Sequence, residues 1–66
     1  MTIGELIRNK RRSKGISVIE LAEMLFVAPT TIYAYETNKK LMPLDRFFEI
    51  IKILDLEWDD IKGVEI

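Results

Sequence analysis

The stretch that decides the fold is VIELAEMLFVAPTTIYAY, residues 18–35. Its apolar residues recur at helical spacing in both halves: Leu21, Ala22 and Leu25, then Ile32 and Tyr35. The joint between the halves is about three residues long, and a turn that short brings two helices together at a steep angle. Close crossing needs a small side chain on the first helix, which Ala22 supplies. The stretch therefore predicts two short helices packed tightly across each other.

Helix starts and stops are marked along the rest of the chain. Thr2 with Glu5, and Ser17 with Glu20, have the spacing of capping boxes. Two further starts and two left-handed stops are marked by residues favoured there: starts at Pro29 and Pro43, stops at Gly15 and Asn38. No run alternates strictly enough to demand a strand. The sequence thus predicts five short helices and an all-α fold.

The C-terminal third, about residues 44–62, is expected to form two helices with more apolar surface than one small core needs. The apolar residues of the fourth helix are unusually many, with these on one face: Leu44, Phe47, Phe48, Ile51 and Leu54, with Ile50 and Ile53 beside them. Trp58 is expected to cover the bottom of the core, and Val64 and Ile66 leave an apolar tail. The excess predicts a two-fold dimer whose interface includes Ile50, Ile53, Trp58, Ile61 and Val64.

Length and composition limit the possible functions. The 66 residues allow one domain, residues 1–66, and contain neither Cys nor His. Zinc sites and Cys–His or Ser–His nucleophile pairs are therefore excluded, so we expect no enzyme, cofactor, metal or small-molecule ligand. The acids at 57–60 fit either a cation site or, as we favour, the positive end of a helix dipole. The longest uncharged stretch, Met24–Tyr35, is shorter than the ~18 residues of a membrane span, which favours a soluble, cytoplasmic protein.

Charge is distributed unevenly along the chain. Residues 1–40 hold seven basic and four acidic side chains, a charge of +3, whereas residues 45–66 hold three basic and seven acidic ones, a charge of −4. This asymmetry indicates either a face for a polyanion with an acidic face opposite, or an ordinary solvated surface. The outward side of the second helix of the pair carries no charge: Pro29, Thr30, Tyr33, Ala34 and Thr37. An uncharged helix face beside basic residues fits the DNA major groove.

The order and spacing of several short motifs resemble the phage repressor and Cro-type (XRE-like) helix-turn-helix family, from about Ile3 to Ile61. The matching motifs are Ile3-Gly4-Glu5, Ile7-Arg8, Arg11, Lys14-Gly15-Ile16-Ser17, Glu20-Leu21-Ala22, Val27, Thr31-Ile32, Tyr35-Glu36, Asn38-Lys39-Lys40 and Leu54-Asp55-Leu56. The resemblance implies a compact five-helix, lambda-repressor-like domain with the helix-turn-helix at about residues 17–37. It also implies a homodimer that reads a near-palindromic operator in double-stranded DNA.

The resemblance assigns roles to individual residues. Base contacts are expected from the exposed half of the third helix: Pro29, Thr30, Tyr33 and Ala34. Phosphate contacts are expected from Ser17, Thr31, Thr37, Lys39 and Lys40. Arg11 is expected to pair with Glu36, which would hold its guanidinium near the DNA backbone. Because the basic face of the first helix lies beside the helix pair, we expect a backbone contact from Arg11 or Arg12.

Three positions depart from the family pattern. Val18 stands where the family usually has Gln, and Ala28 stands where it often has a Ser or Thr cap. Phe26 stands in the turn, where Gly or Asn is common because the residue takes a positive φ. A bulky residue in that conformation costs on the order of 1–2 kcal/mol.

Two functions remain open from the sequence. The first is a dimeric transcription regulator, a repressor rather than an activator, because promoter occupancy suffices for repression and 66 residues leave no room for a sensing domain. The second is a protein-interaction module of the same fold, an antirepressor or antitoxin with weak or no DNA reading. Val18, Ala28 and the net charge of −1 favour the second.

Overall fold

The computed structural model describes residues 1–65, which form five helices and no β-sheet. The helices are α1 (Ile3–Ser13), α2 (Val18–Leu25), α3 (Pro29–Glu36), α4 (Leu44–Leu54) and α5 (Trp58–Ile61). An isolated parallel bridge pairs Thr2 with Glu65. The predicted all-α, five-helix architecture is confirmed, and the predicted helix-turn-helix corresponds to α2 and α3. Ile66, in the predicted apolar tail, lies outside the described residues.

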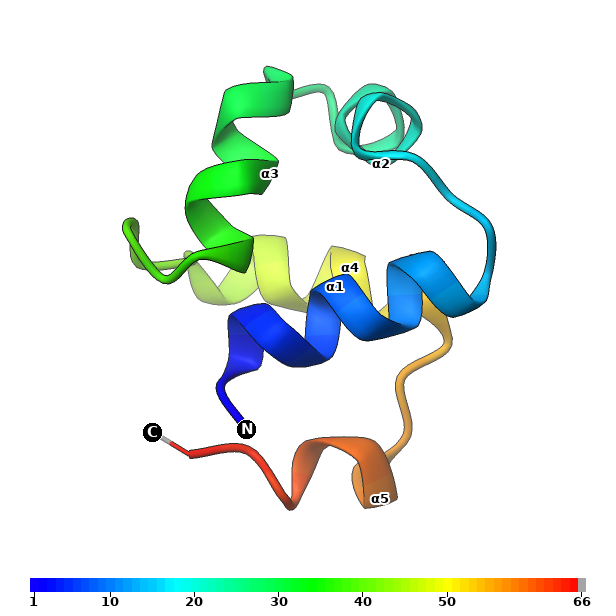
Figure 1. Cartoon of the computed structure of the whole chain (residues 1–66), viewed down its shortest axis with the longest axis vertical. Helices are drawn as coiled ribbons and strands as arrows, with labels where there is room; N and C mark the ends of the chain where they lie inside the picture. Colours follow the sequence, from blue (N-terminus) through cyan, green and yellow to red (C-terminus); the bar gives the residue numbers. More distant parts are fainter. Residues whose placement is uncertain (66) are drawn as a thin grey trace.

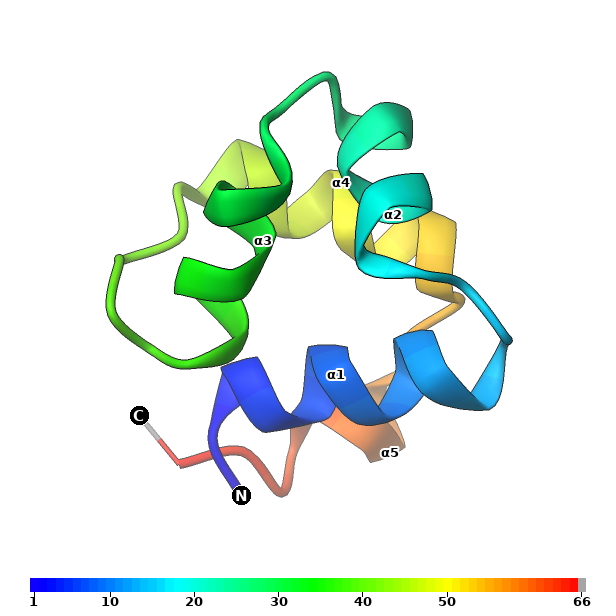
Figure 2. The ribbon, with the colours of Figure 1, turned by 45° about the horizontal axis from the view of Figure 1, so that its top comes forward.

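The helix pair α2–α3 lies on one side of α1, and α5 lies on the other (Figures 1 and 2). α4 runs behind α1 in Figure 1 and behind α2 and α3 in Figure 2. α2 and α3 diverge by 108°, the steep crossing that their short joint predicts, and Ala22 is 1% exposed there. Within residues 1–65 no single helix is long and apolar enough to span a membrane; α2 and α3 pass that test only as a bent pair.

Both predicted capping boxes are present. The Thr2 hydroxyl accepts from the Glu5 amide at 3.2 Å, and Glu5 Oε1 accepts from the Thr2 amide at 3.0 Å. Ser17 and Glu20 make the same reciprocal pair, at 3.0 Å each. Backbone N–H groups that bond a carboxylate favour its charged form, so the pKa values of Glu5 and Glu20 are lowered. These local bonds fix where α1 and α2 begin.

α4 turns only part of its wide apolar surface to the core. Ile50 and Leu54, one turn apart, are both 0% exposed, because α4 packs against α1 and α2 along this stripe. Leu44 and Phe48 are 67% and 54% exposed. Leu44 and Phe48 therefore form a second, outward apolar stripe.

Trp58 also lies on the surface. It is 73% exposed, so the prediction that it covers the bottom of the core is wrong. Leu56, which precedes the short α5, is buried instead of Trp58. Ile61, the last residue of α5, packs against the core.

α5 and the end of α4 are tied to the C-terminal half of α1 and its cap by ion pairs. Lys10 Nζ lies 3.4 Å from Asp60 Oδ2, and Lys14 Nζ lies 3.2 Å from Asp55 Oδ2. Asp60 also accepts from the Glu57 amide at 3.0 Å, and this backbone bond is the main cause of its lowered pKa. The acids at 57–60 thus serve the start of α5, and no group of three metal-ligating side chains occurs within residues 1–65.

The turn between α2 and α3 contains a strained aromatic residue. Gly15 and Asn38 take the predicted left-handed conformation, with φ of 70° and 60°, and Phe26 takes it as well, with φ of 58°. The Phe26 side chain is 95% exposed. Since it packs against nothing that offsets the strain, Phe26 destabilises the turn relative to glycine.

Replacing Phe26 with Gly is expected to stabilise the protein. Relief of the left-handed strain outweighs the added entropy of the unfolded chain, so we expect a net gain of about 0.5–1 kcal/mol. For a domain of this size that gain corresponds to a rise in Tm of about 2–8 °C, measured by circular dichroism. Phe26→Ala keeps the strain and removes the ring, so it is expected to melt near the wild type. A lower Tm for Phe26→Gly contradicts the prediction.

Candidate nucleic-acid interface

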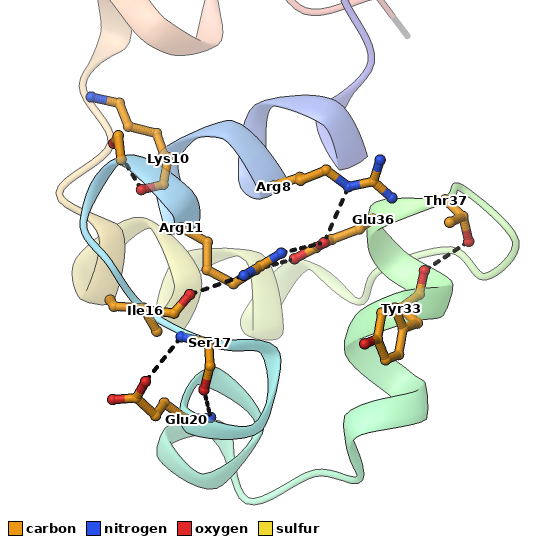
Figure 3. Close-up of polar contacts among 10 residues, drawn as sticks. Arg8, Lys10, Arg11, Ile16, Ser17, Glu20, Tyr33, Glu36 and Thr37 are labelled. Atoms are coloured by element: carbon orange, nitrogen blue, oxygen red, sulfur yellow. Dashed lines mark hydrogen bonds and ion pairs between the residues drawn. The ribbon is translucent and has the colours of Figure 1, made fainter.

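α3 has one buried face and one exposed face. Ile32 and Tyr35 are 1% and 4% exposed and anchor the helix in the core. Of the four predicted base-contacting residues, Pro29, Thr30 and Tyr33 are exposed and Ala34 is half-buried. Figure 3 shows Tyr33 projecting from the ribbon of α3. This outward face carries no charged side chain, because Glu36, the only charged residue of α3, is buried.

The loop after α3 is held against the end of that helix. The backbone amides of Lys39 and Lys40 both donate to the carbonyl of Ala34, at 2.9 and 3.3 Å. The Thr37 hydroxyl donates to the Tyr33 carbonyl at 2.7 Å. The side chains of both lysines are exposed, and neither joins an ion pair within the described residues. The backbone of these two lysines, unpaired among the described residues, is thus fixed at the end of α3.

The predicted pair of Arg11 and Glu36 is present and buried. Arg11 Nε donates to Glu36 Oε2 at 2.7 Å, and Nη2 donates to Oε1 at 3.1 Å. Arg11 Nη1 donates to the Ile16 carbonyl at 2.9 Å. Hydrogen bonding to Glu36 is the main cause of a raised pKa for the Arg11 guanidinium. Because the Arg11 side chain is only 8% exposed, the structure places it between helices rather than at the surface, where a phosphate contact was predicted.

Arg8 joins the same carboxylate and was missed among the predicted contacts. Its Nε lies 3.4 Å from Glu36 Oε1, and its side chain is 36% exposed (Figure 3). The spacing of Arg8 and Arg11 is the signal that could have found it, since residues three apart are neighbours on a helix. Two guanidinium groups from α1 therefore converge on one carboxylate from α3.

The other residues of this part of the chain that were predicted to contact phosphate are exposed or half-buried. Arg12 is exposed and forms no ion pair with any described residue. Ser17 is exposed at the start of α2, where its hydroxyl accepts from the Glu20 amide. Thr37 is exposed and Thr31 half-buried. The DNA roles of all these residues stay predictions.

The predicted dimer residues do not form one surface. Ile50 is 0% exposed, so its assignment to an interface is wrong; it belongs to the inward stripe of α4. Ile53, Ile61 and Val64 are half-buried and pack against the core, whereas Trp58 is exposed. A groove of about 380 Å³ lies next to Trp58 and is lined by Ile3, Phe47, Trp58, Ile61, Lys62, Val64 and Glu65.

Comparisons with known proteins agree with this geometry. The family model described as Helix-turn-helix matches residues 7–61, which is most of the chain. A structure described as the master regulator for biofilm formation SinR in complex with DNA superposes with a TM-score of 0.75. The two sequences are 30% identical, and the match covers 89% of this chain and 98% of that one. No curated protein sequence matches at a significant level.

The family motifs noted in the sequence fall on the elements that the family requires. The short joint places α2 across α3, and the Arg11–Glu36 pair ties α1 to the end of α3. The matched region covers α2, α3, α4 and α5 completely. The chain belongs to the XRE-type helix-turn-helix family, whose members mostly regulate transcription.

Proposed function

We propose that this protein is a sequence-specific, double-stranded-DNA-binding transcription regulator that acts as a homodimeric repressor on a near-palindromic operator. It would act where the DNA is, in the cytoplasm of a prokaryotic host. The observation that carries the proposal is the uncharged, exposed face of α3 with Lys39 and Lys40 fixed beside it. Thr30 and Tyr33 offer hydroxyl and ring contacts to base edges, and the lysines offer charge to phosphates. The structural likeness to SinR, which is described in complex with DNA, supports the same proposal.

A second candidate is a protein-interaction module with weak DNA reading, such as an antirepressor or antitoxin. Internal pairing of the basic side chains of α1 favours it. Lys10 and Lys14 are engaged by Asp60 and Asp55, and Arg11 is engaged by Glu36. Arg12 forms no ion pair with any described residue, and Arg8 shares the Glu36 carboxylate with Arg11. The charge available for DNA is thus smaller than the +3 of residues 1–40 indicates.

The two functions differ in their dependence on salt. A dimer that uses about six phosphates loses roughly a thousandfold in affinity for duplex DNA between 50 and 200 mM salt. Fluorescence anisotropy with operator candidates selected from a random DNA pool measures that loss. Absence of binding at 50 mM salt, to selected and random duplexes alike, contradicts the regulator and favours the interaction module.

Replacing the two loop lysines is expected to lower affinity for DNA, whereas replacing Thr30 is expected to change the preferred DNA sequence. Replacing both Lys39 and Lys40 with Ala removes four phosphate contacts from a dimer, so the slope of log K against log salt falls by about 3.6 for every sequence tested. Thr30→Ala is the matched variant on the recognition face; it is expected to change the preferred base at one position of each half-site and to leave the slope intact. A selection that returns the same motif for Thr30→Ala contradicts the proposed docking of α3.

The proposed dimer uses the exposed apolar residues of the C-terminal third. Leu44, Phe48 and Trp58 are each more than half exposed, and Trp58 lines the apolar groove beside α5. α5 and the helix pair α2–α3 lie on opposite sides of α1 (Figure 1). A dimer through the α5 side therefore leaves both α3 helices free. A two-fold axis there would set the α3 helices about one DNA turn apart, roughly 34 Å.

Trp58→Ser is expected to weaken the dimer by about thirtyfold or more, as loss of a buried aromatic anchor does. Sedimentation velocity across a dilution series measures the change in the dissociation constant. Phe26→Ser is the matched control, because it removes an aromatic side chain that is even more exposed than Trp58 but lies at the α2–α3 turn. Equal association constants for the Trp58→Ser variant and the wild type contradict this interface.

A further inference from the structure

The two guanidinium groups that meet Glu36 are not equivalent. Arg11 uses Nε, Nη1 and Nη2 in hydrogen bonds, and its side chain is 8% exposed. Arg8 uses Nε alone, at the long distance of 3.4 Å, and its side chain is 36% exposed. Among the described residues no partner bonds either terminal nitrogen of Arg8. Arg8 therefore keeps free donors, whereas Arg11 keeps few.

The excess positive charge of the cluster formed by Arg8, Arg11 and Glu36 lies on Arg8. Two guanidinium groups share one carboxylate, so the three side chains together carry a charge of +1. Arg11 makes the short, bidentate pair with Glu36, the geometry in which a guanidinium and a carboxylate neutralise each other most fully. The uncompensated positive charge consequently lies on the outer end of Arg8.

Arg8 lies near the end of α3, where its positive charge adds to the charges of Lys39 and Lys40. Figure 3 shows its terminal nitrogens directed away from Glu36, toward the end of α3 that carries Thr37. Lys39 and Lys40 follow directly, and their amides are bonded to the Ala34 carbonyl of the same helix end. A cation at a helix C-terminus is favoured by the helix dipole, so Arg8 rests there without needing a second carboxylate.

We infer that Arg8, and not the buried Arg11, is the α1 guanidinium that contacts a DNA phosphate, with the Arg11–Glu36 pair holding it in position. This inference rests on the DNA-binding function proposed above. A guanidinium with both terminal nitrogens free matches phosphate oxygens bidentately. The contact carries no base information, so it positions the protein on the duplex and adds affinity for every sequence.

The test measures the salt dependence of duplex binding for Arg8→Gln, Arg8→Lys and the wild type. Arg8→Gln is expected to lower affinity by about tenfold or more at 100 mM salt. The slope of log K against log salt should also fall by about 1.8 per dimer, the value for two phosphates. Arg8→Lys is expected to keep the wild-type slope, because it keeps the charge. The preferred DNA sequence should be the same for all three proteins.

Lys10→Gln is the matched control, since it removes one positive charge from the same helix at a residue already paired with Asp60. It is expected to leave the slope unchanged. An unchanged slope for Arg8→Gln, a reduced slope for Arg8→Lys, or an equal fall for Lys10→Gln overturns the assignment. A merely structural role for Arg8 lowers Tm without changing the slope. Failure of the wild type to bind any duplex is a different outcome, because it contradicts the proposed function itself.

Discussion

Glu36→Ala is expected to leave the protein largely unfolded at 37 °C. The substitution removes the carboxylate that bonds Arg11 at 2.7 and 3.1 Å and leaves that guanidinium 8% exposed without its counter-charge. Removing one partner of a buried ion pair costs about 3–5 kcal/mol. A chain of this length has a total stability of only about 3–10 kcal/mol. Urea and thermal unfolding followed by circular dichroism measure the loss.

The matched control replaces both members of the pair. Arg11→Met with Glu36→Leu removes the buried charge altogether, and such apolar replacements are often neutral or stabilising. The double variant is therefore expected to regain most of the stability that Glu36→Ala loses. If the single variant unfolds with a loss below about 1 kcal/mol, within the range of a surface ion pair, the pair does not lock α1 to α3 as described. If the double variant is as unstable as the single one, lost packing and not unpaired charge is the cause.

The parts of the fold that local chemistry decides could be predicted from the sequence. Both capping boxes depend on side chains three residues apart, and the left-handed residues Gly15 and Asn38 depend on backbone preference at helix ends. The strain at Phe26 followed from the family resemblance, because the residue at this position of the turn takes a positive φ. These features need no knowledge of what packs against them.

The orientation of α4 could not be predicted in the same way. Its apolar residues cover more than half of the helix circumference, so periodicity alone does not say which stripe faces inward. Contact with α1 and α2 selects Ile50 and Leu54 and leaves Leu44 and Phe48 outside. The misplacement of Ile50 in the dimer interface follows from this ambiguity, and Trp58 was misplaced because Leu56 occupies the core position beside it.

In the candidate interface, too, some features could be predicted from the sequence and others could not. The exposed side of α3 followed from the buried pair Ile32 and Tyr35, because a helix anchored on one face presents the opposite one. The burial of Arg11 and the exposure of Arg8 depend on how α1 meets the end of α3, and that contact joins residues 25 and 28 positions apart in sequence. Spacing within α1 shows that the two arginines are neighbours, but it does not show which one reaches solvent.

Gly4→Ala is expected to destabilise the protein by about 2–3 kcal/mol or more, as overpacking of a tight contact does. A Cβ atom at Gly4 would lie 2.5 Å from the carbonyl oxygens of both Tyr35 and Glu36. These oxygens belong to the backbone of α3, so they cannot turn aside as a side chain can. α1 must therefore move away from α3, which also stretches the Arg11–Glu36 pair. Thermal unfolding is expected to show a fall in Tm of about 10 °C or more.

The decisive result is whether Gly4→Ala lowers or raises the stability, since helix propensity alone predicts that it raises the stability. Within a helix, Gly→Ala stabilises by about 0.8–1 kcal/mol when nothing obstructs the new methyl group. Gly63→Ala is the matched control, because a Cβ there meets no atom within 4 Å and the residue does not have a positive φ. It is expected to leave Tm unchanged or slightly raised. A Gly4→Ala variant that melts at or above the wild type shows that α1 and α3 are not in backbone contact, and it removes the support on which the Arg11–Glu36 geometry depends.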